Sequence, residues 1–296
     1  MGDGYNIAEL NAALADTPFA GRLHHFATIH STNAYALEQA QADAPSGSVY
    51  FADEQTSGRG RGGHAWHSEP NAGLYVSVLL RPRLSPSAAL LLSLATGLAV
   101  RDAIAEVCGL TADIRWPNDI LLEGKKCCGI LVETAVSGDA SAAGEPATQT
   151  GTAMGRPPAT GPAEVHLLRH VVIGIGLNVN HAAFPPELSS LATSLRLVTG
   201  YEWPRQPLLV ELLRALHHET QLLQPEAGDA GGASALLKRF SRASTWVSGK
   251  HVHVQEAGGY TGVTDGLDRR GFLRVRSADG MRTVLSGGVR ELPPEI

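Results

Sequence analysis

Glycine and arginine alternate in one short segment, residues 55–66 (QTSGRGRGGHAW), called here the Gly/Arg loop. Glycines lack a Cβ atom, so backbone N–H groups can approach an anion closely. Arg59 and Arg61 add planar cationic groups that match a carboxylate or a phosphate. A flexible linker or an RNA-binding tract has the same composition, so the loop alone leaves these alternatives open. No Gly-Lys-Ser/Thr follows, and this excludes a P-loop.

A second candidate begins at residues 115–120 (RWPNDI) and continues through residues 125–133 (KKCCGILVE). Lysines are seldom buried without a partner, so Lys126 at the start of an apolar strand predicts an ammonium directed into a pocket. Asn118 and Asp119 precede this strand, and short polar groups there can bind a metal or orient a nucleophile. Taken alone, an ordinary β-turn with solvated charges explains these two residues better.

Two shorter patterns complete the set. Residues 174–180 (GIGLNVN) place two glycines within a strand, where a ligand or a neighbouring backbone can come close. The third glycine and the following helix of a dinucleotide-binding motif are missing, which argues against such a site. Residues 31–33 (STN) stand at a predicted strand–helix junction that can bind a small polar group. A routine helix N-cap is the simpler explanation for them in isolation.

Hydrophobic periodicity predicts the elements that position these residues. Strands are expected at residues 23–29, 49–54, 74–80, 114–116, 120–122, 129–134 and 165–179, and helices at residues 5–15, 32–41, 85–107, 207–223 and 233–243. Ser85 or Ser87 is expected to cap the long third helix. From residue 245 onward, five short β-prone runs separated by Gly and Asp predict a small β-barrel of roughly fifty residues.

Composition limits the class of protein. The 296 residues carry a net charge of −5, which argues against a protein that coats nucleic acid. Three cysteines, two of them adjacent, do not form a disulfide framework and favour a reducing compartment. We find no signal peptide and expect no apolar stretch long enough to cross a bilayer. Residues 137–162, almost all small residues, Gly and Pro, predict a disordered insertion. A soluble, cytoplasmic protein is expected.

Together and in this order, the patterns resemble the bacterial biotin–protein ligase (biotin–[acetyl-CoA-carboxylase] ligase) family. The resemblance rests on the Ser-Thr-Asn turn, GRGRxG with a downstream Trp, WPND, KxxGILxE and GIGxN, and it covers roughly residues 23–292. Lipoate–protein ligases share the fold but not this combination, and they remain the alternative. Only thirty residues precede Ser31, so the chain resembles the monofunctional type without an N-terminal DNA-binding domain.

The resemblance implies an α+β fold: a mixed, largely antiparallel sheet with packed helices, related to class II aminoacyl-tRNA synthetases, and a small C-terminal SH3-like β-barrel. The implied domains are residues 1–244 and 245–296. The implied activity is ATP-dependent activation of biotin to biotinyl-5′-AMP, with Mg²⁺, and transfer of biotin to a lysine of a carrier protein such as that of acetyl-CoA carboxylase. No DNA or membrane partner is expected, and a homodimer is compatible with the resemblance.

The resemblance also assigns roles to residues. Lys126, Arg61 and Asp119 are the expected catalytic residues, and no metal ligand is singled out. The expected ligand-binding residues are Ser31, Thr32, Asn33, Gln55, Gly58, Arg59, Gly60, Arg61, Gly63, Trp66, Asn118, Lys126, Gly129 and Asn178. Gly62 and His64 stand where many members carry basic residues, which puts the nucleotide contacts of those side chains in doubt.

Overall fold

A computed structural model describes residues 4–136, 167–224, 231–256, 258–285 and 288–292. Its larger part is a seven-stranded sheet in the order β1-β2-β3-β7-β6-β5-β4. The strands are β1 (Leu23–Ile29), β2 (Ser48–Gln55), β3 (Gly73–Leu80), β4 (Asp113–Arg115), β5 (Asp119–Leu122), β6 (Lys125–Val136) and β7 (Leu168–Asn178). Only the β1–β2 pair is parallel, so the expected mixed, largely antiparallel sheet is confirmed.

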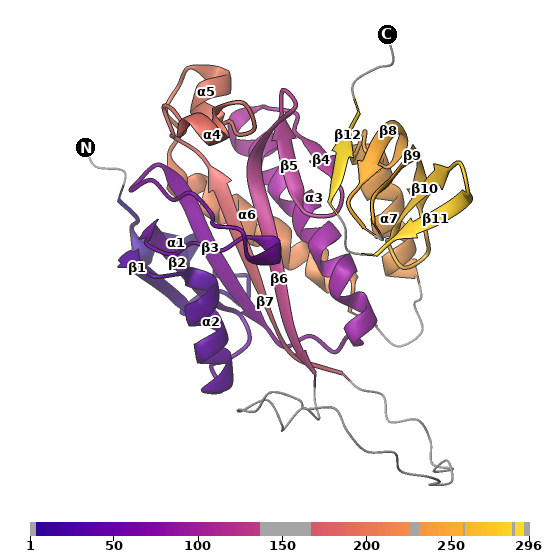
Figure 1. Cartoon of the computed structure of the whole chain (residues 1–296). Coiled ribbons are helices and arrows are strands. Elements are labelled where there is room, and N and C mark those ends of the chain that lie inside the picture. The colour runs from indigo at the N-terminus through magenta and orange to yellow at the C-terminus, as the bar shows by residue number, and fades with distance from the viewer. Residues whose placement is uncertain (1–3, 137–166, 225–230, 257, 286–287, 293–296) are drawn as a thin grey trace, which may run out of the picture.

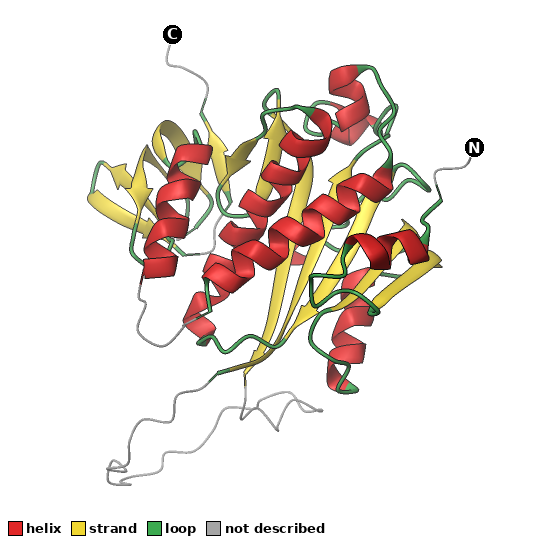
Figure 2. Ribbon diagram, turned by 180° about the vertical axis from the view of Figure 1, so that it is seen from behind, coloured by secondary structure: helices red, strands yellow, loops and turns green. Residues whose placement is uncertain are grey.

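Helices cover both faces of this sheet (Figures 1 and 2). On one face, α2 (Thr32–Gln41) packs on β2, β3 and β7. On the other lie α1 (Ile7–Ala13), α3 (Ala89–Cys108) and α6 (Arg205–Leu222), with α7 (Gly231–Ala243) against α3. Neighbouring strand residues divide between the two layers: Val49 and Phe51 join the larger core, and Tyr50 joins the smaller core under α2. This is the two-residue period of a strand buried on both faces.

The C-terminal part is a small antiparallel β-structure with strand order β11-β10-β9-β8-β12. Its strands are β8 (Ser248–Val254), β9 (Tyr260–Leu267), β10 (Leu273–Ser277), β11 (Gly280–Val284) and β12 (Val289–Glu291). All five predicted runs form strands, as expected for the SH3-like barrel. The Trp116 indole donates a hydrogen bond to the Gly271 carbonyl at 2.9 Å, which ties the barrel to the larger sheet.

Several boundaries differ from the predictions. Strand β6 begins four residues before the predicted start, because the polar residues at 125–126 still pair with β5. Neither serine caps the long helix: a 3-10 turn (Pro86–Ala88) precedes it, Ala88 is its N-cap, and the hydroxyls of Ser85 and Ser87 bond each other at 2.7 Å. The short helices α4 (Pro186–Ser189) and α5 (Leu195–Thr199) were not predicted, since they are too brief to show a helical period.

No apolar stretch long enough to cross a bilayer was expected from the sequence, and this expectation is wrong by the length and composition of one helix. The helical stretch Pro86–Cys108 is long and apolar enough to cross a bilayer, and 67% of its most apolar window is buried inside the protein. The helix is apolar nearly all round because α6, α7 and the sheet cover it, as in a central core helix. The predicted insertion at residues 137–162 lies outside the described residues, and the domain boundary at residue 244 stays a prediction.

Candidate active site

A narrow pocket opens on the α2 side of the sheet and rests on two opposed glycines. Gly129 of β6 pairs with Gly176 of β7, and the Trp66 ring lies on them. A Cβ atom at Gly176 would stand 2.5 Å from this ring, and one at Gly129 would stand 2.7 Å from it. The strand glycines were expected to admit a ligand or a backbone. Gly176 admits the indole that covers the pocket, and Gly174 admits the Asn33 side chain.

The inner end of the narrow pocket is lined by neutral polar groups. The Thr32 backbone N–H and hydroxyl donate to Gln55 Oε1 at 2.8 and 3.1 Å. The Ser77 hydroxyl lies 2.9 Å from Thr32 Oγ1 and 3.2 Å from Asn33 Oδ1. The Asn33 amide donates in turn to Glu133. Because these buried groups bond one another, the pocket is preorganised for a neutral hydrogen-bonding ligand.

The other end of the pocket is cationic. Lys126 Nζ lies 2.5 Å from Asp119 Oδ1, and Arg115 Nη2 lies 2.6 Å from Asp119 Oδ2. Burial by itself raises the pKa of Asp119, but the charges of Lys126 and Arg115 outweigh it and hold that pKa below its usual value. The carboxylate is therefore ionised at neutral pH and fixes both cations at the pocket mouth.

A wide cavity adjoins this end. Its volume is about 720 Å³, against about 40 Å³ for the narrow pocket. Among its described lining residues are four cations, Arg61, Arg115, Lys126 and Arg290, and a single carboxylate, Asp119. Arg290 comes from the C-terminal barrel, which also contributes Gln255, Gly288 and Val289. The cationic excess suits a polyanion.

The Gly/Arg loop forms a small closed hairpin between the two cavities. Gly60 N–H donates to the His64 carbonyl at 2.7 Å, and Trp66 N–H donates to the Gly58 carbonyl at 2.9 Å. Gly62 and Gly63 have φ of 69° and 79°, a left-handed conformation that strongly favours glycine. The glycine that departs from the family pattern at position 62 thus fits the local backbone.

Most predicted site residues meet at these cavities. Those lining the narrow pocket are Ser31, Thr32, Asn33, Gln55, Arg59, Gly60, Arg61, Trp66, Asn118, Lys126 and Gly129. Asp119 and Asn178 line the wide cavity, which shares Gly60, Arg61, Trp66, Asn118 and Lys126. Gly58 and Gly63 line neither: Gly58 is buried behind Trp66, and Gly63 faces open space. The Asn178 amide donates to the Thr193 carbonyl at 3.0 Å and so braces the segment after β7.

Sequence reasoning missed other residues at the site. Ser77 is the one polar residue in the otherwise apolar strand GLYVSVLL, and that contrast could have revealed it. Glu133 ends the KxxGILxE motif, but no role was predicted for it from the sequence. Gln255 and Arg290 had no such signal, because they enter the site only through the docking of the barrel.

The two cavities define a class of enzyme. The narrow pocket has a neutral polar end and a cationic mouth, the chemistry of a site for a small carboxylic acid, and at about 40 Å³ it admits one only if the Trp66 ring moves off the two glycines. The wide cavity beside that mouth fits a nucleotide, so the pair fits an enzyme that joins a carboxylic acid to a nucleotide.

Comparisons with known proteins name the family. Residues 25–143 match the Biotin/lipoate A/B protein ligase family, and residues 247–289 match the Biotin protein ligase C terminal domain. The biotin–[acetyl-CoA-carboxylase] ligase of Paracoccus denitrificans is 39% identical over 260 residues, which are 86% of this chain and 94% of that protein. The Mycobacterium tuberculosis ligase of the same name is 33% identical over 266 residues, covering 87% and 84% of the two chains.

A solved structure agrees. Biotin protein ligase from Aquifex aeolicus in complex with biotin and ATP superposes with a TM-score of 0.70 at 25% identity, over 92% of this chain and 100% of that one. The chain belongs to the biotin–protein ligase family.

Proposed function

We propose that this protein activates biotin with ATP to biotinyl-5′-AMP and then transfers biotin to one lysine of a carrier protein, such as that of acetyl-CoA carboxylase. The observation that carries the proposal is the junction of the two cavities at Lys126. The neutral polar end suits a ureido ring, the glycine floor suits an apolar bicyclic body once the Trp66 ring moves off it, and the cationic mouth suits a carboxylate.

In the first step a carboxylate oxygen of biotin attacks the α-phosphorus of ATP, and the bond to pyrophosphate breaks. Two anions must meet, so their repulsion has to be neutralised. Lys126 and Arg115 are already held in place by Asp119, and Arg59 and Arg61 lie on the facing loop. Preorganised charges of this kind stabilise the developing negative charge without further reorganisation. Alignment of the two substrates supplies much of the remaining rate enhancement.

Mg²⁺ is expected to enter as part of the substrate, MgATP. The carboxylate among the described lining residues of the wide cavity, Asp119, already pairs with two cations, which makes it a poor magnesium ligand. Mg²⁺ prefers oxygen ligands and keeps several waters. Triphosphate oxygens can therefore supply most of its remaining ligands.

In the second step the amine of the carrier lysine attacks the acyl carbon, and AMP leaves. That amine has a reference pKa of about 10.4 and must lose a proton. Asp119 is our candidate proton acceptor. Because Lys126 and Arg115 lower its pKa, this role requires Lys126 to turn from Asp119 to the phosphate. No enzyme nucleophile is needed, and burial raises the pKa of Cys127 and Cys128, which makes these thiols poor nucleophiles.

Pyrophosphate exchange tests the activation step. Exchange of labelled pyrophosphate into ATP should depend on biotin and should not respond to lipoate, the substrate of the alternative ligase. Transfer is then measured as ATP-dependent biotinylation of a carrier domain, with the acceptor lysine replaced by Arg as the control. If lipoate drove pyrophosphate exchange and biotin did not, the protein would instead be a lipoate–protein ligase.

We also infer a cytoplasmic protein that works without a DNA partner; the net charge of −5 supports this inference. A gel shift with duplex DNA, in the presence of biotin and MgATP, should give no complex. Sedimentation with and without these ligands would decide whether the protein is a homodimer.

A further inference from the structure

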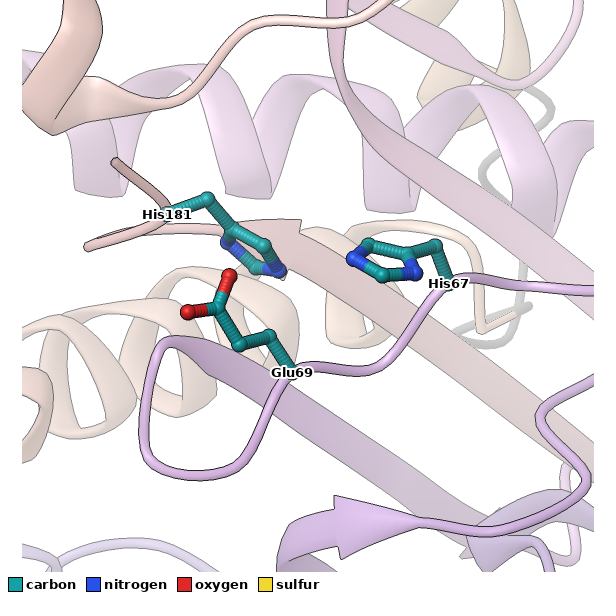
Figure 3. A group of neighbouring side chains, drawn as sticks. All are labelled: His67, Glu69 and His181. Atoms are coloured by element: carbon teal, nitrogen blue, oxygen red, sulfur yellow. The ribbon is translucent and has the colours of Figure 1, made fainter. Parts of the chain in front are cut away.

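Three side chains that the proposed reaction does not use lie close together (Figure 3), and one of them, His67, lines the wide cavity. His67 and Glu69 lie between the Gly/Arg loop and β3, and His181 follows the end of β7. One nitrogen of each imidazole and one carboxylate oxygen all lie within 4.8 Å of one another. The cluster therefore joins two segments that are more than a hundred residues apart in sequence.

His181 is fully buried, yet part of its ring lacks a partner. Its Nε2 lies 3.3 Å from the Tyr75 hydroxyl, and that hydroxyl donates to the Glu69 backbone carbonyl at 3.1 Å. Since Tyr75 has a single proton to donate, its oxygen accepts from His181 Nε2–H. The proton then sits on Nε2, and Nδ1 keeps a lone pair. Nδ1 has no hydrogen-bond partner among the described residues. A buried acceptor without a partner is costly, and a ligand would satisfy it.

The surroundings of the cluster resemble those of a metal-binding site. The Phe184 ring stacks on His181 with centroids 5.1 Å apart and 11° between the planes, and it contacts His67 edge-on at 6.1 Å. The Ser194 hydroxyl donates to the His181 carbonyl at 2.7 Å and fixes the backbone. Ligating histidines usually have an apolar neighbour that limits water and a hydrogen bond that orients the imidazole, and for His181 these are Phe184 and the Tyr75 hydroxyl.

We propose that His67, Glu69 and His181 bind a divalent transition-metal ion of the Zn²⁺ class, with one position left for water or for a group in the wide cavity. Two imidazoles and one carboxylate form a ligand set that suits zinc. Magnesium and calcium prefer all-oxygen sites, so this ion is distinct from that of MgATP. Tetrahedral zinc with bonds of about 2.0–2.1 Å needs ligand atoms roughly 3.4 Å apart. The ion would therefore draw His67 and Glu69 inward by about 1 Å and fasten the end of the Gly/Arg loop to the segment after β7.

The test is metal binding by the full chain, freed of metals with a chelator and measured without biotin or ATP. Isothermal titration with Zn²⁺ should give one tight site per chain, and Co²⁺ should give the visible spectrum of a four-coordinate nitrogen–oxygen site. Glu69→Gln and His67→Ala should each weaken Zn²⁺ binding at least about tenfold and should abolish the Co²⁺ spectrum. Zn²⁺ should raise the melting temperature of the wild type but not of these variants.

His251→Ala is the matched control, because it removes an exposed histidine of the barrel and should leave binding unchanged. His181 is buried, so its variant can fail to fold; Glu69→Gln preserves the shape of the side chain and avoids that ambiguity. Equal Zn²⁺ affinity in the wild type and in the His67→Ala/Glu69→Gln double variant, or no binding by the wild type, would overturn the proposal. Neither result bears on biotin activation, which pyrophosphate exchange measures separately.

Discussion

The narrow pocket and the wide cavity share Lys126 and Asn118 but are built in different ways. The narrow pocket rests on central strands, and its polar groups are hydrogen-bonded to one another, Thr32 to Gln55 and Ser77 to Thr32. The wide cavity is lined mostly by loops, by the segment after β7 and by the barrel, with the ends of four strands contributing Arg115, Asp119, Lys126 and Asn178. Rigid strands favour precise recognition of one small acid, whereas loops and a docked domain can admit a larger ligand and later a protein partner.

The two cavities also differ in charge. Neutral hydrogen-bonding groups dominate the inner end of the narrow pocket, and unpaired charge would be expensive there. The wide cavity collects cations, which attract a polyanion even before it is aligned. The comparison predicts that changes in the narrow pocket affect the use of biotin, that changes in the wide cavity affect the use of ATP, and that changes at their junction affect both.

Replacement of Lys126 should have the largest effect. Lys126→Met removes one of the two cations, with Arg61, that line both cavities, and biotin-dependent pyrophosphate exchange should fall by roughly 10²–10³-fold. The fold should survive, because Asp119 keeps its ion pair with Arg115. Lys125→Met is the control: this exposed neighbour lies outside both cavities and should exchange pyrophosphate at the normal rate. Exchange by Lys126→Met near the wild-type rate would remove Lys126 from the mechanism.

A methyl group on the pocket floor should affect biotin selectively. Gly176→Ala places a Cβ atom 2.5 Å from the Trp66 ring, so the ring must move by about 1 Å. We expect a loss of about 1–3 kcal/mol of stability and a rise of about 10–100-fold in the KM for biotin, with little change in the KM for MgATP. Gly97→Ala is the matched control, since its Cβ would meet Ile114 at an ordinary 3.5 Å and alanine favours the helix. Equal shifts in both KM values would show that the two cavities are not independent.

The loop between the cavities should be mobile without ligand and ordered with it. Its glycines give the unliganded loop many backbone states, and contacts from Arg59 and Arg61 to an adenylate can offset the ordering cost. Trypsin should therefore cut the free protein after these arginines. At concentrations about tenfold above Kd, biotin with MgATP should slow the cut about tenfold, and MgATP alone should slow it less. Identical cleavage in every condition would exclude a ligand-dependent lid.

Much of the narrow pocket could be predicted because its residues lie within short contiguous motifs. Ser31 shows the principle: a hydroxyl directly before a helical run predicts an N-cap, and its side chain accepts from Ala34 N–H at the start of α2. Lys126 stood out by its charge at the start of an apolar strand. The strand periods predicted every strand of the sheet, although β6 extends beyond its apolar stretch because backbone pairing continues through polar residues.

The wide cavity could not be predicted in the same way. Arg290 lines the same cavity as Arg115 and Asp119 but lies about 170 residues away from them in sequence, and the docking of Trp116 on the barrel brings these segments to one cavity. The Asp119 ion pairs are local, since Arg115 faces Asp119 across the β4–β5 hairpin and Lys126 lies on the neighbouring strand β6, but the spacing around PND predicted only a turn. The prediction that Ser85 or Ser87 caps the long helix was wrong for a related reason. The turn at Pro86 brings the two hydroxyls together instead.

The barrel contact should give a smaller effect, confined to ATP. Arg290 is exposed at the cavity rim, and exposed charge contacts contribute about 1 kcal/mol or less. Arg290→Ala should raise the KM for MgATP by up to about fivefold and leave the KM for biotin unchanged. Arg276→Ala is the control, because this exposed barrel arginine pairs with Asp265 outside both cavities. A larger effect on biotin than on MgATP would contradict the assignment of the wide cavity to the nucleotide.

The smallest effect is expected far from both cavities. Strands β6 and β7 pair as far as Val136 and Leu168, where the predicted insertion at residues 137–162 interrupts the chain. Val136 lies ten residues beyond Lys126 along one strand, about 33 Å away at 3.3 Å per residue. Replacing residues 137–162 with a short Gly/Asn turn keeps the ladder intact and changes loop-closure entropy only slightly. Melting temperature and both KM values should stay close to the wild type. If carrier biotinylation alone declined while pyrophosphate exchange persisted, the segment would instead take part in recognising the carrier. A third surface, in addition to the two cavities, would then contribute to the reaction.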